Sequence, residues 1–149
     1  LDTKELYTVK SIIDIQEGKY RNKDTVIFTK KERHSDMLGA FYKLRTIPQE
    51  KLITMDTIYF TYLYGGIEYN SFIINHGVEF INTKFGIVKS IKCEPLLVKG
   101  RVFKETKGAY VWVTANNMHI PVKLEIPILV GSIYANLVSY ENTLFDLNN

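Results

Sequence analysis

The sequence predicts a mainly β protein built as one antiparallel meander, and three observations lead to this fold class. The chain has 149 residues, which fits a single domain. Ten tyrosines, eight phenylalanines and one tryptophan make up 13% of it, and such residues are favoured on half-buried sheets. Most segments also alternate like strands and are separated by short turns, which is typical of antiparallel pairing. About ten strands in one domain favour a sheet curled into an open pseudo-barrel, with one short helix at its concave side.

The N-terminal third contains two predicted strands and the only predicted helix. The strands cover Leu6–Ile15 and Lys19–Lys30, with a turn at Gly18. The helix covers Asp36–Arg45, because Ser35 or Asp36 can cap its start and apolar residues then follow at helical spacing. Pro48 is expected to end this element.

A first hairpin is predicted around Gly65-Gly66, which separates residues 57–64 from residues 67–74. Closing this turn gives one almost wholly apolar face, with the pairs Tyr64–Ile67, Tyr62–Tyr69, Phe60–Ser71 and Ile58–Ile73. The opposite face is mixed and carries Tyr59 and Phe72.

A second hairpin is predicted at Asn116-Asn117, because asparagine tolerates a positive φ. It gives an aliphatic face with the pairs Val113–Ile120, Val111–Val122 and Ala109–Leu124. Its other face holds six residues, Tyr110, Trp112, Thr114, His119, Lys123 and Glu125, with Pro121 opposite Trp112. Because Pro121 and Pro127 lack an N–H, the far side of their strand is predicted to be a sheet edge or to pair irregularly.

The remaining strands are expected at Val78–Asn82, Ile87–Cys93, Leu97–Lys104 and Ile133–Tyr140. The chain shows no internal repeat and no linker-like stretch, so residues 1–149 are treated as a single domain.

Charge and cysteine content argue against several classes of protein. Nineteen basic and sixteen acidic residues give a net charge of +3, and the four arginines are scattered, which does not suit a nucleic-acid surface. The longest uncharged stretch, residues 126–140, is broken by Pro127 and Gly131 and is too short to span a membrane. Cys93 is the only cysteine, so no internal disulfide is expected.

The sequence contains no recognisable catalytic or cofactor motif, and we predict neither an enzyme nor a cofactor. His34, His76 and His119 lie in separate segments without metal-ligand spacing. Cys93 is expected to be a buried structural thiol, and His119 a solvated turn residue. A weaker hypothesis, a glycan hydrolase, would need two of the strand glutamates to face each other across a cleft.

Aromatic side chains opposite the apolar hairpin faces are the candidate site. Tyr59, Phe72, Tyr110 and Trp112 could stack on a sugar or lipid, or pack on a partner protein. The alternative is structural: the helix covers these rings, or they pair with one another across strands.

Two segments resemble a family of exported envelope proteins that is catalogued only as a domain of unknown function. Residues 36–45 (DMLGAFYKLR) resemble its D-x-x-S-A-x-Y-x-x-R helix, with Gly39 in place of serine. Residues 83–95 (TKFGIVKSIKCEP) resemble its T-x-x-G-x-x-x-C-x-x-x-P type of strand. Further matches follow in the expected order at Phe103, residues 112–114, 120–122 and 131–133, and Leu137.

The resemblance implies a YmcC-like open pseudo-barrel in the periplasm or cell envelope of Gram-negative bacteria, with no catalytic residues to carry over. The leading hypothesis is therefore a non-enzymatic exported protein that binds a lipid, a glycan or an envelope protein in the curled sheet. The alternative is an assembly module of envelope or surface-polysaccharide biogenesis, which acts through the strand edge at Pro121 and Pro127. A removed leader and an N-terminal lipid anchor are left open.

Overall fold

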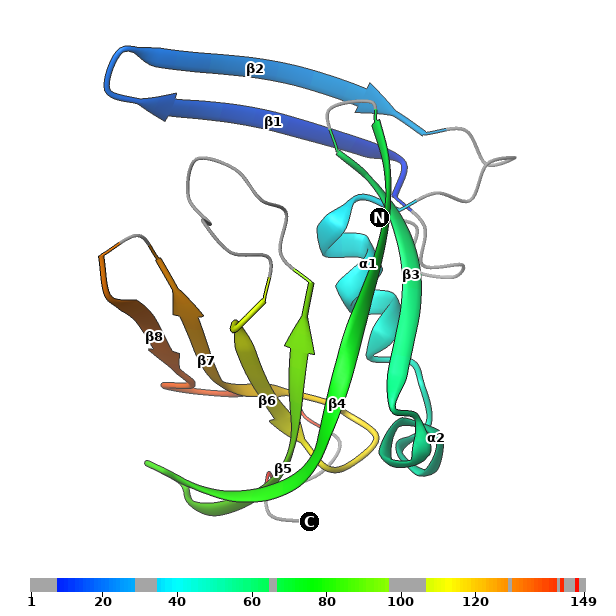
Figure 1. Ribbon diagram of the computed structural model, residues 1–149, viewed down its shortest axis with the longest axis vertical. Coiled ribbons are helices and arrows are strands. Elements are labelled where there is room, and N and C mark those ends of the chain that lie inside the picture. The colour runs from blue at the N-terminus through cyan, green and yellow to red at the C-terminus, as the bar shows by residue number, and fades with distance from the viewer. Residues whose placement is uncertain are drawn as a thin grey trace. The chain divides into compact units, whose positions relative to one another are not determined.

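The computed structural model describes residues 8–28, 35–64, 67–96, 107–128, 130–141, 143 and 147. Two strands, β1 and β2, form a hairpin of their own, and six further strands form a sheet in the order β3-β4-β5-β6-β7-β8 (Figure 1). The antiparallel meander predicted from the sequence is confirmed. The elements are β1 (Lys10–Glu17), β2 (Tyr20–Ile27), α1 (Met37–Leu44), α2 (Gln49–Thr54), β3 (Thr57–Tyr64), β4 (Ile67–Thr83), β5 (Gly86–Pro95), β6 (Tyr110–Thr114), β7 (Pro121–Pro127) and β8 (Ser132–Asn136).

The six-stranded sheet is open among the described residues, because β3 and β8 stand at its two ends in the hydrogen-bonding order. The structure also contains a second helix, α2, which the sequence did not lead us to expect. Pro48 precedes α2 with φ −56°, and its carbonyl accepts hydrogen bonds from the N–H groups of Lys51 and Leu52. A proline at a helix start loses no needed donor and is already in a suitable φ. Pro48 therefore begins a helix where we expected it only to end one.

Strand β4 is longer than predicted and combines two of the expected strands. Its pairing with β5 shifts between Asn75 and Val78, where Gly77 adopts φ 91° and donates its N–H to Asn75 Oδ1 over 2.8 Å. A bulge of this kind lets one strand bend and continue, so the break in alternation does not end it. The strand predicted at Leu97–Lys104 and the turn at Gly65-Gly66 lie outside the described residues.

The chain divides into two compact units, which we describe separately. Unit 1 contains residues 1–44 and 60–71, and unit 2 contains residues 45–59 and 72–149. In unit 1 the cap predicted for the first helix is present: Asp36 Oδ1 accepts the N–H of Gly39 over 2.7 Å and the hydroxyl of Thr8 over 3.1 Å. Below this cap, Phe41 of α1 packs on Phe60 of β3 with ring centroids 6.2 Å apart.

Gly39 has no room for a side chain, and this predicts the effect of adding one. A Cβ there would lie 2.5 Å from Thr8 Oγ1, so Gly39→Ala must displace the hydroxyl that bonds Asp36. We expect the variant to lose about 1–3 kcal/mol in free energy of unfolding, measured by urea titration. Adding Thr8→Ala should remove the closest contact and reduce the cost of Gly39→Ala, while Asp36 Oδ1 and Ser35 Cβ still lie 3.1 and 3.3 Å from the new Cβ. An unchanged cost in the double variant would contradict this packing.

The first hairpin agrees with its predicted register where its contacts are described. The rings of Tyr62 and Tyr69 stack with centroids 5.6 Å apart, and Thr61 Oγ1 donates to Asn70 Oδ1 over 2.9 Å. On the predicted apolar face Tyr62 is 3% exposed, whereas Tyr59 on the other face is 79% exposed. The alternation therefore separated Tyr62 from Tyr59 correctly, whereas Tyr64 and Ile67, predicted on the apolar face beside the turn, are 40% and 59% exposed.

The second hairpin differs from its prediction in both register and loop. Trp112 pairs with Lys123 and Val113 with Pro121, with a bulge between them, so Pro121 does not lie opposite Trp112. The reason lies in the loop, which runs from residue 115 to residue 120 instead of turning tightly at Asn116-Asn117. Asn116 is buried, and its Oδ1 accepts hydrogen bonds from Thr114 Oγ1 at 2.8 Å and Met118 N at 3.1 Å.

The strand edge predicted at Pro121 and Pro127 is wrong. Strand β7 pairs with β6 on one side and with β8 on the other. The two prolines are its first and last residues, where a missing N–H costs least. The edge of this half of the sheet is β8.

Candidate functional site on the face of strands β4 to β7

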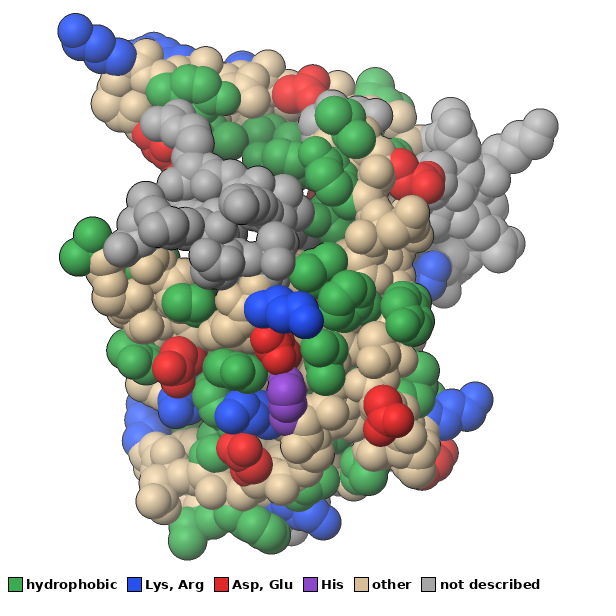
Figure 2. Space-filling view, in the orientation of Figure 1, with side chains coloured by type: hydrophobic (Ala, Val, Ile, Leu, Met, Phe, Trp, Pro, Cys, Tyr) green, Lys and Arg blue, Asp and Glu red, His purple; other side chains and the backbone are tan. Residues whose placement is uncertain are grey.

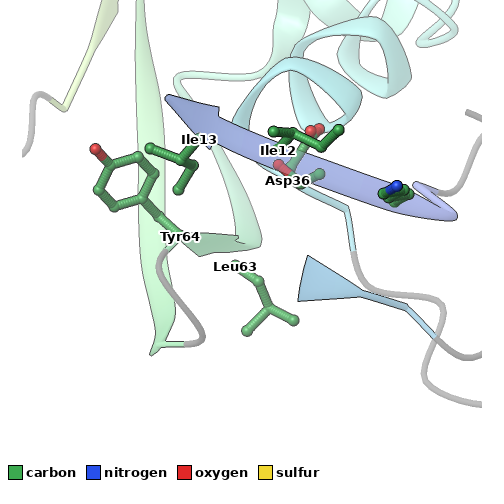
Figure 3. A pocket seen from close by; sticks show the side chains of 7 residues that line it. Ile12, Ile13, Asp36, Leu63 and Tyr64 are labelled. Carbon is green, nitrogen blue, oxygen red and sulfur yellow. The ribbon is translucent and has the colours of Figure 1, made fainter. Parts of the chain in front are cut away.

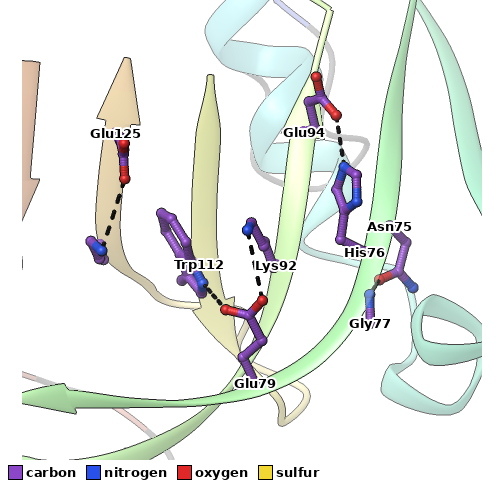
Figure 4. A network of polar contacts seen from close by, with 9 residues as sticks. Asn75, His76, Gly77, Glu79, Lys92, Glu94, Trp112 and Glu125 are labelled. Atoms are coloured by element: carbon purple, nitrogen blue, oxygen red, sulfur yellow. Dashed lines mark hydrogen bonds and ion pairs between the residues drawn. The ribbon is translucent and has the colours of Figure 1, made fainter. Parts of the chain in front are cut away.

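One face of unit 2 carries charged and aromatic side chains from four neighbouring strands. The pairing fixes this arrangement, because Lys92 lies opposite Trp112 and Trp112 opposite Lys123, and directly paired residues share a face. Figure 2 shows acidic, basic and histidine side chains gathered there, and Figure 4 shows their contacts. We call this set the polar-aromatic face: His76, Glu79, Lys92, Glu94, Tyr110, Trp112, Lys123 and Glu125.

Trp112 lies at the centre of this face and is almost fully covered. It is 5% exposed, and its indole N–H donates to Glu79 Oε2 over 2.9 Å. The ammonium of Lys123 lies 4.4 Å from its ring centroid and that of Lys92 lies 5.3 Å away. Trp112 also belongs to the apolar core that contains Val88 and Val122. The indole ring of Trp112 is therefore packed in the core, and the ammonium groups of Lys92 and Lys123 lie against this ring.

Lys92 links the aromatic and acidic parts of the face. Its ammonium is 4.4 Å from the ring centroid of Tyr110 and 3.7 Å from Glu79 Oε1. A cation against an aromatic ring is attracted by the negative charge of the ring face, and the carboxylate adds a charge-assisted contact. The side chain of Lys92 is 25% exposed, so a ligand can still reach it.

A histidine–glutamate pair lies beside Tyr110. His76 Nε2 is 2.7 Å from Glu94 Oε2, the N–H of Gly108 donates to the other oxygen of Glu94 over 2.9 Å, and the His76 ring meets Tyr110 edge-on at 5.7 Å. Burial would raise the pKa of Glu94, but the hydrogen bonds from Gly108 and His76 and the charges of His76 and Lys107 lower it on balance. Glu94 is therefore held as a carboxylate.

The lowered pKa of Glu94 predicts a pH-dependent stability. A carboxyl whose pKa falls on folding stabilises the native state above its unfolded value and loses that contribution as the pH falls through its folded value. At pH 7 we expect Glu94→Gln to cost about 1.5–3 kcal/mol in free energy of unfolding, because charged hydrogen bonds are lost. The difference from wild type should shrink as the pH falls below the ordinary glutamate pKa of 4.5 and through the lowered pKa of folded Glu94.

Urea titrations at several pH values measure this difference, and Glu125→Gln is the matched control. Glu125 lies on the same face and makes a long ion pair of 4.0 Å with Lys123. We therefore expect Glu125→Gln to change the free energy of unfolding by less than about 0.5 kcal/mol. A Glu94→Gln deficit that stays constant down to pH 3 would contradict the assignment.

The structure brings the four predicted aromatic residues onto one sheet face, in two pairs. The rings of Tyr110 and Trp112 are 6.0 Å apart, and those of Tyr59 and Phe72 are 6.2 Å apart. Phe72 is two residues from Ile74, which pairs with Glu94, so the strand alternation places Phe72 on the same face as Glu94. Trp112 is buried and Tyr59 is open to solvent, whereas Tyr110 and Phe72 are both half-buried.

Sequence reasoning placed Lys123 and Glu125 beside Trp112 but missed the contributions of β4 and β5. Lys92 and Glu94 stand two residues apart, as do Lys123 and Glu125, which is the spacing that places side chains on one face of a strand. That signal was readable. The contribution of His76 was not, because the bulge at Asn75–Val78 shifts the alternation of β4.

A pocket and a buried histidine lie apart from the polar-aromatic face. A pocket of about 250 Å³ in unit 1 is lined by β1 and β3 (Figure 3), but its carboxylate, Asp36, already caps α1. His119 is not a solvated turn residue as predicted: it is 2% exposed, and its Nε2 lies 2.8 Å from the carbonyl oxygen of Ile47. This contact ties the β6–β7 loop to the segment before α2.

Within the described ranges, no group of three or more His, Cys, Asp and Glu side chains could hold a metal ion. No helix in the same part of the chain is long and apolar enough to cross a bilayer.

The fold and this face define a mainly β protein with a preformed polar and aromatic surface on an open antiparallel sheet. Residues 2–138 match the family described as protein of unknown function (DUF3108), and the chain belongs to that family. No curated protein and no solved structure matches it.

Proposed function

We propose that this protein is a non-enzymatic binding protein that holds a neutral glycan on the polar-aromatic face. The observation that carries the proposal is the position of Lys92, whose ammonium lies against Tyr110 and Trp112 and pairs with Glu79. Fixed donors and acceptors beside aromatic rings suit a ligand with many hydroxyl groups, which both donate and accept hydrogen bonds.

The charge balance of the face supports a neutral ligand. Three lysines, at positions 92, 107 and 123, lie on or beside it together with three glutamates, at positions 79, 94 and 125. Opposite charges in equal number do not build the positive potential that attracts a polyanion. The side chains are partly exposed, with Glu79 at 44% and Lys123 at 35%, so they remain accessible for hydrogen bonding. An acyl chain would find few bare apolar groups among them.

The setting of this activity is part of the proposal. The resemblance of residues 36–45 and 83–95 to exported envelope proteins supports export to the periplasm or cell envelope, and the curling of the sheet into a YmcC-like pseudo-barrel belongs to the same expectation. In the periplasm or cell envelope, the protein would present the bound glycan to another envelope component and would not convert it chemically.

The chain's single tryptophan makes the proposal directly testable. Because Trp112 touches both lysines of the face, a ligand that moves either ammonium changes its fluorescence. We expect chitohexaose or maltohexaose, as neutral glycan probes, to change Trp112 emission in a saturable titration. Lys92→Met should weaken that binding at least about tenfold, because the charge is lost while the stem remains.

Lys89→Met is the matched control, since Lys89 lies on the same strand and its partner Phe80 faces the other side. It should bind like wild type. Saturable binding to phosphatidylglycerol vesicles but to neither oligosaccharide would replace the glycan by a lipid. Binding that is equally weakened by both substitutions would contradict the site.

One observation favours the second candidate function, an assembly module that acts through a strand edge. All five residues of β8 are exposed and the strand stands at the end of the sheet. An assembly module that acts through a strand edge would therefore use β8, and not the prolines of β7.

A further inference from the structure

Strand β8 presents backbone hydrogen-bonding groups away from its only partner strand in the described sheet. The N–H of Leu137 donates to the carbonyl oxygen of Val122, and that of Ile128 to Gly131. In the register that pairs Glu125 with Tyr134, hydrogen-bonded pairs alternate with non-bonded ones. It follows that Gly131, Ile133, Ala135 and Leu137 bond towards β7, and that Ser132, Tyr134 and Asn136 point their N–H and C=O groups outward.

This edge lacks the charged residues and prolines with which many proteins protect an exposed strand. No charged residue occurs between Glu125 and Glu141, and no proline follows Pro127. Charges, prolines and bulges at an edge prevent pairing with other chains. At the other end of the sheet, the outer edge of β3 is partly paired. The N–H of Leu63 donates to the carbonyl oxygen of Ser35, and Leu63 forms an isolated β-bridge with Asp36. Among the described residues, the outer edge of β8 is therefore open to pairing with a further strand.

The residues around Tyr134 form a nearly palindromic pattern. Val130 and Val138 lie four residues to either side, Ser132 and Asn136 two residues to either side, and Ile133 and Ala135 are the immediate neighbours. Both valines are exposed, at 87% and 69%, and Tyr134 is 61% exposed. Such a pattern is complementary to itself when read in the opposite direction, which is the requirement of a two-fold symmetric contact.

We propose that β8 pairs antiparallel with β8 of a second copy of this chain, with Tyr134 on the two-fold axis. In this register Ser132 meets Asn136 of the other copy, and the outward N–H of each of these residues and of Tyr134 meets an outward carbonyl. Val130 and Val138 lie just outside β8, and the two tyrosine rings meet across the axis. No charge opposes a like charge, so a second copy fits this edge without penalty.

The pairing would also join two binding faces. Tyr134 pairs with Glu125 within the chain, so its ring lies on the same side of the sheet as the polar-aromatic face. A β8–β8 contact would place the two faces on one continuous twelve-stranded side (six strands from each copy). This inference does not depend on which ligand the face binds.

Sedimentation equilibrium of the wild-type chain from about 1 µM to 1 mM tests the contact, with a dimer expected within that range. Tyr134→Pro removes a donor that β7 does not use, so the fold should persist while the dimer dissociation constant rises by about 100-fold. Tyr134→Phe is the matched control and should dimerise like wild type. A chain that stays monomeric throughout, or a dimer that Tyr134→Pro leaves intact, would overturn the proposal.

Cysteine cross-linking tests the register even if the proline variant fails to fold. Across a hydrogen-bonded antiparallel pair the Cα atoms are about 5.5 Å apart, which suits a disulfide. Tyr134→Cys should therefore give a covalent dimer when copper–phenanthroline is added as oxidant, and Ala135→Cys should not. The native thiol does not interfere, because Cys93 is buried and burial raises its pKa to about 11. Cross-linking at 135 in preference to 134 would contradict the axis.

Discussion

Replacing Trp112 with alanine is expected to lower the free energy of unfolding by about 3–5 kcal/mol, one of the two largest losses that we predict. The indole is 5% exposed and packs in the core with Val88 and Val122. It also supports the polar side of the face, because its N–H bonds Glu79 and two lysines lie against its ring. Chemical denaturation followed by circular dichroism measures the loss without relying on tryptophan emission.

Trp112→Phe separates the two roles of this side chain. Phenylalanine keeps most of the apolar contact but cannot donate to Glu79, so we expect a smaller loss of about 1–2 kcal/mol. Glycan binding should weaken as well, because Glu79 and Lys92 lose their fixed positions. A phenylalanine variant as unstable as the alanine variant would contradict this division of roles.

Ile91→Ala is expected to have a comparable effect, about 2–5 kcal/mol, through the other side of the sheet. Ile91 is 0% exposed and lies in β5 between Val78 of β4 and Val113 of β6. Truncating it leaves a cavity that two flanking strands cannot easily collapse into. Urea titration measures the change.

Ile87→Ala is the matched control, because Ile87 lies on the same strand and the same side four residues earlier. It is 64% exposed, so its truncation should change stability by less than about 0.5 kcal/mol. Equal losses at positions 87 and 91 would show that the apolar side of β5 is covered differently from this structure.

The elements that sequence reasoning identified correctly depend on local chemistry. The alternation in residues 57–74 placed Tyr62 inside and Tyr59 outside, because strand side chains alternate with a period of two. Asp36 was correctly identified as a cap of α1, because its carboxylate reaches the N–H three residues later. Both signals lie within a few residues of the feature that they predict.

The predictions for Asn116 and His119 were wrong because the conformation there depends on contacts that the local sequence does not reveal. Asn116 suggested a tight turn, but its side chain bonds Thr114 and Met118 and holds a longer loop, so the register of β6 and β7 shifts. His119 was assigned to solvent, yet it reaches Ile47, 72 residues away in sequence. Propensity at a single position carries no information about such partners.

The candidate site was accessible to sequence reasoning only in part. Trp112, Tyr110, Lys123 and Glu125 could be grouped, because they share one hairpin. The spacing of Lys92 and Glu94 predicts that they share a strand face, but joining them and Glu79 to this hairpin requires the pairing of β4 with β5 and of β5 with β6. The sequence predicted an aromatic platform, whereas the structure has a network of charged side chains around the buried Trp112 ring.

The most direct test of this account is a two-dimensional ¹H–¹⁵N NMR titration of the one indole N–H. We expect a single indole signal that exchanges slowly with solvent, because Trp112 is buried and bonded to Glu79. We also expect this signal to shift saturably when chitohexaose or maltohexaose is added, and to do so less readily in Lys92→Met. An indole signal that exchanges rapidly, or that neither oligosaccharide moves, would contradict a preformed glycan-binding face at Trp112.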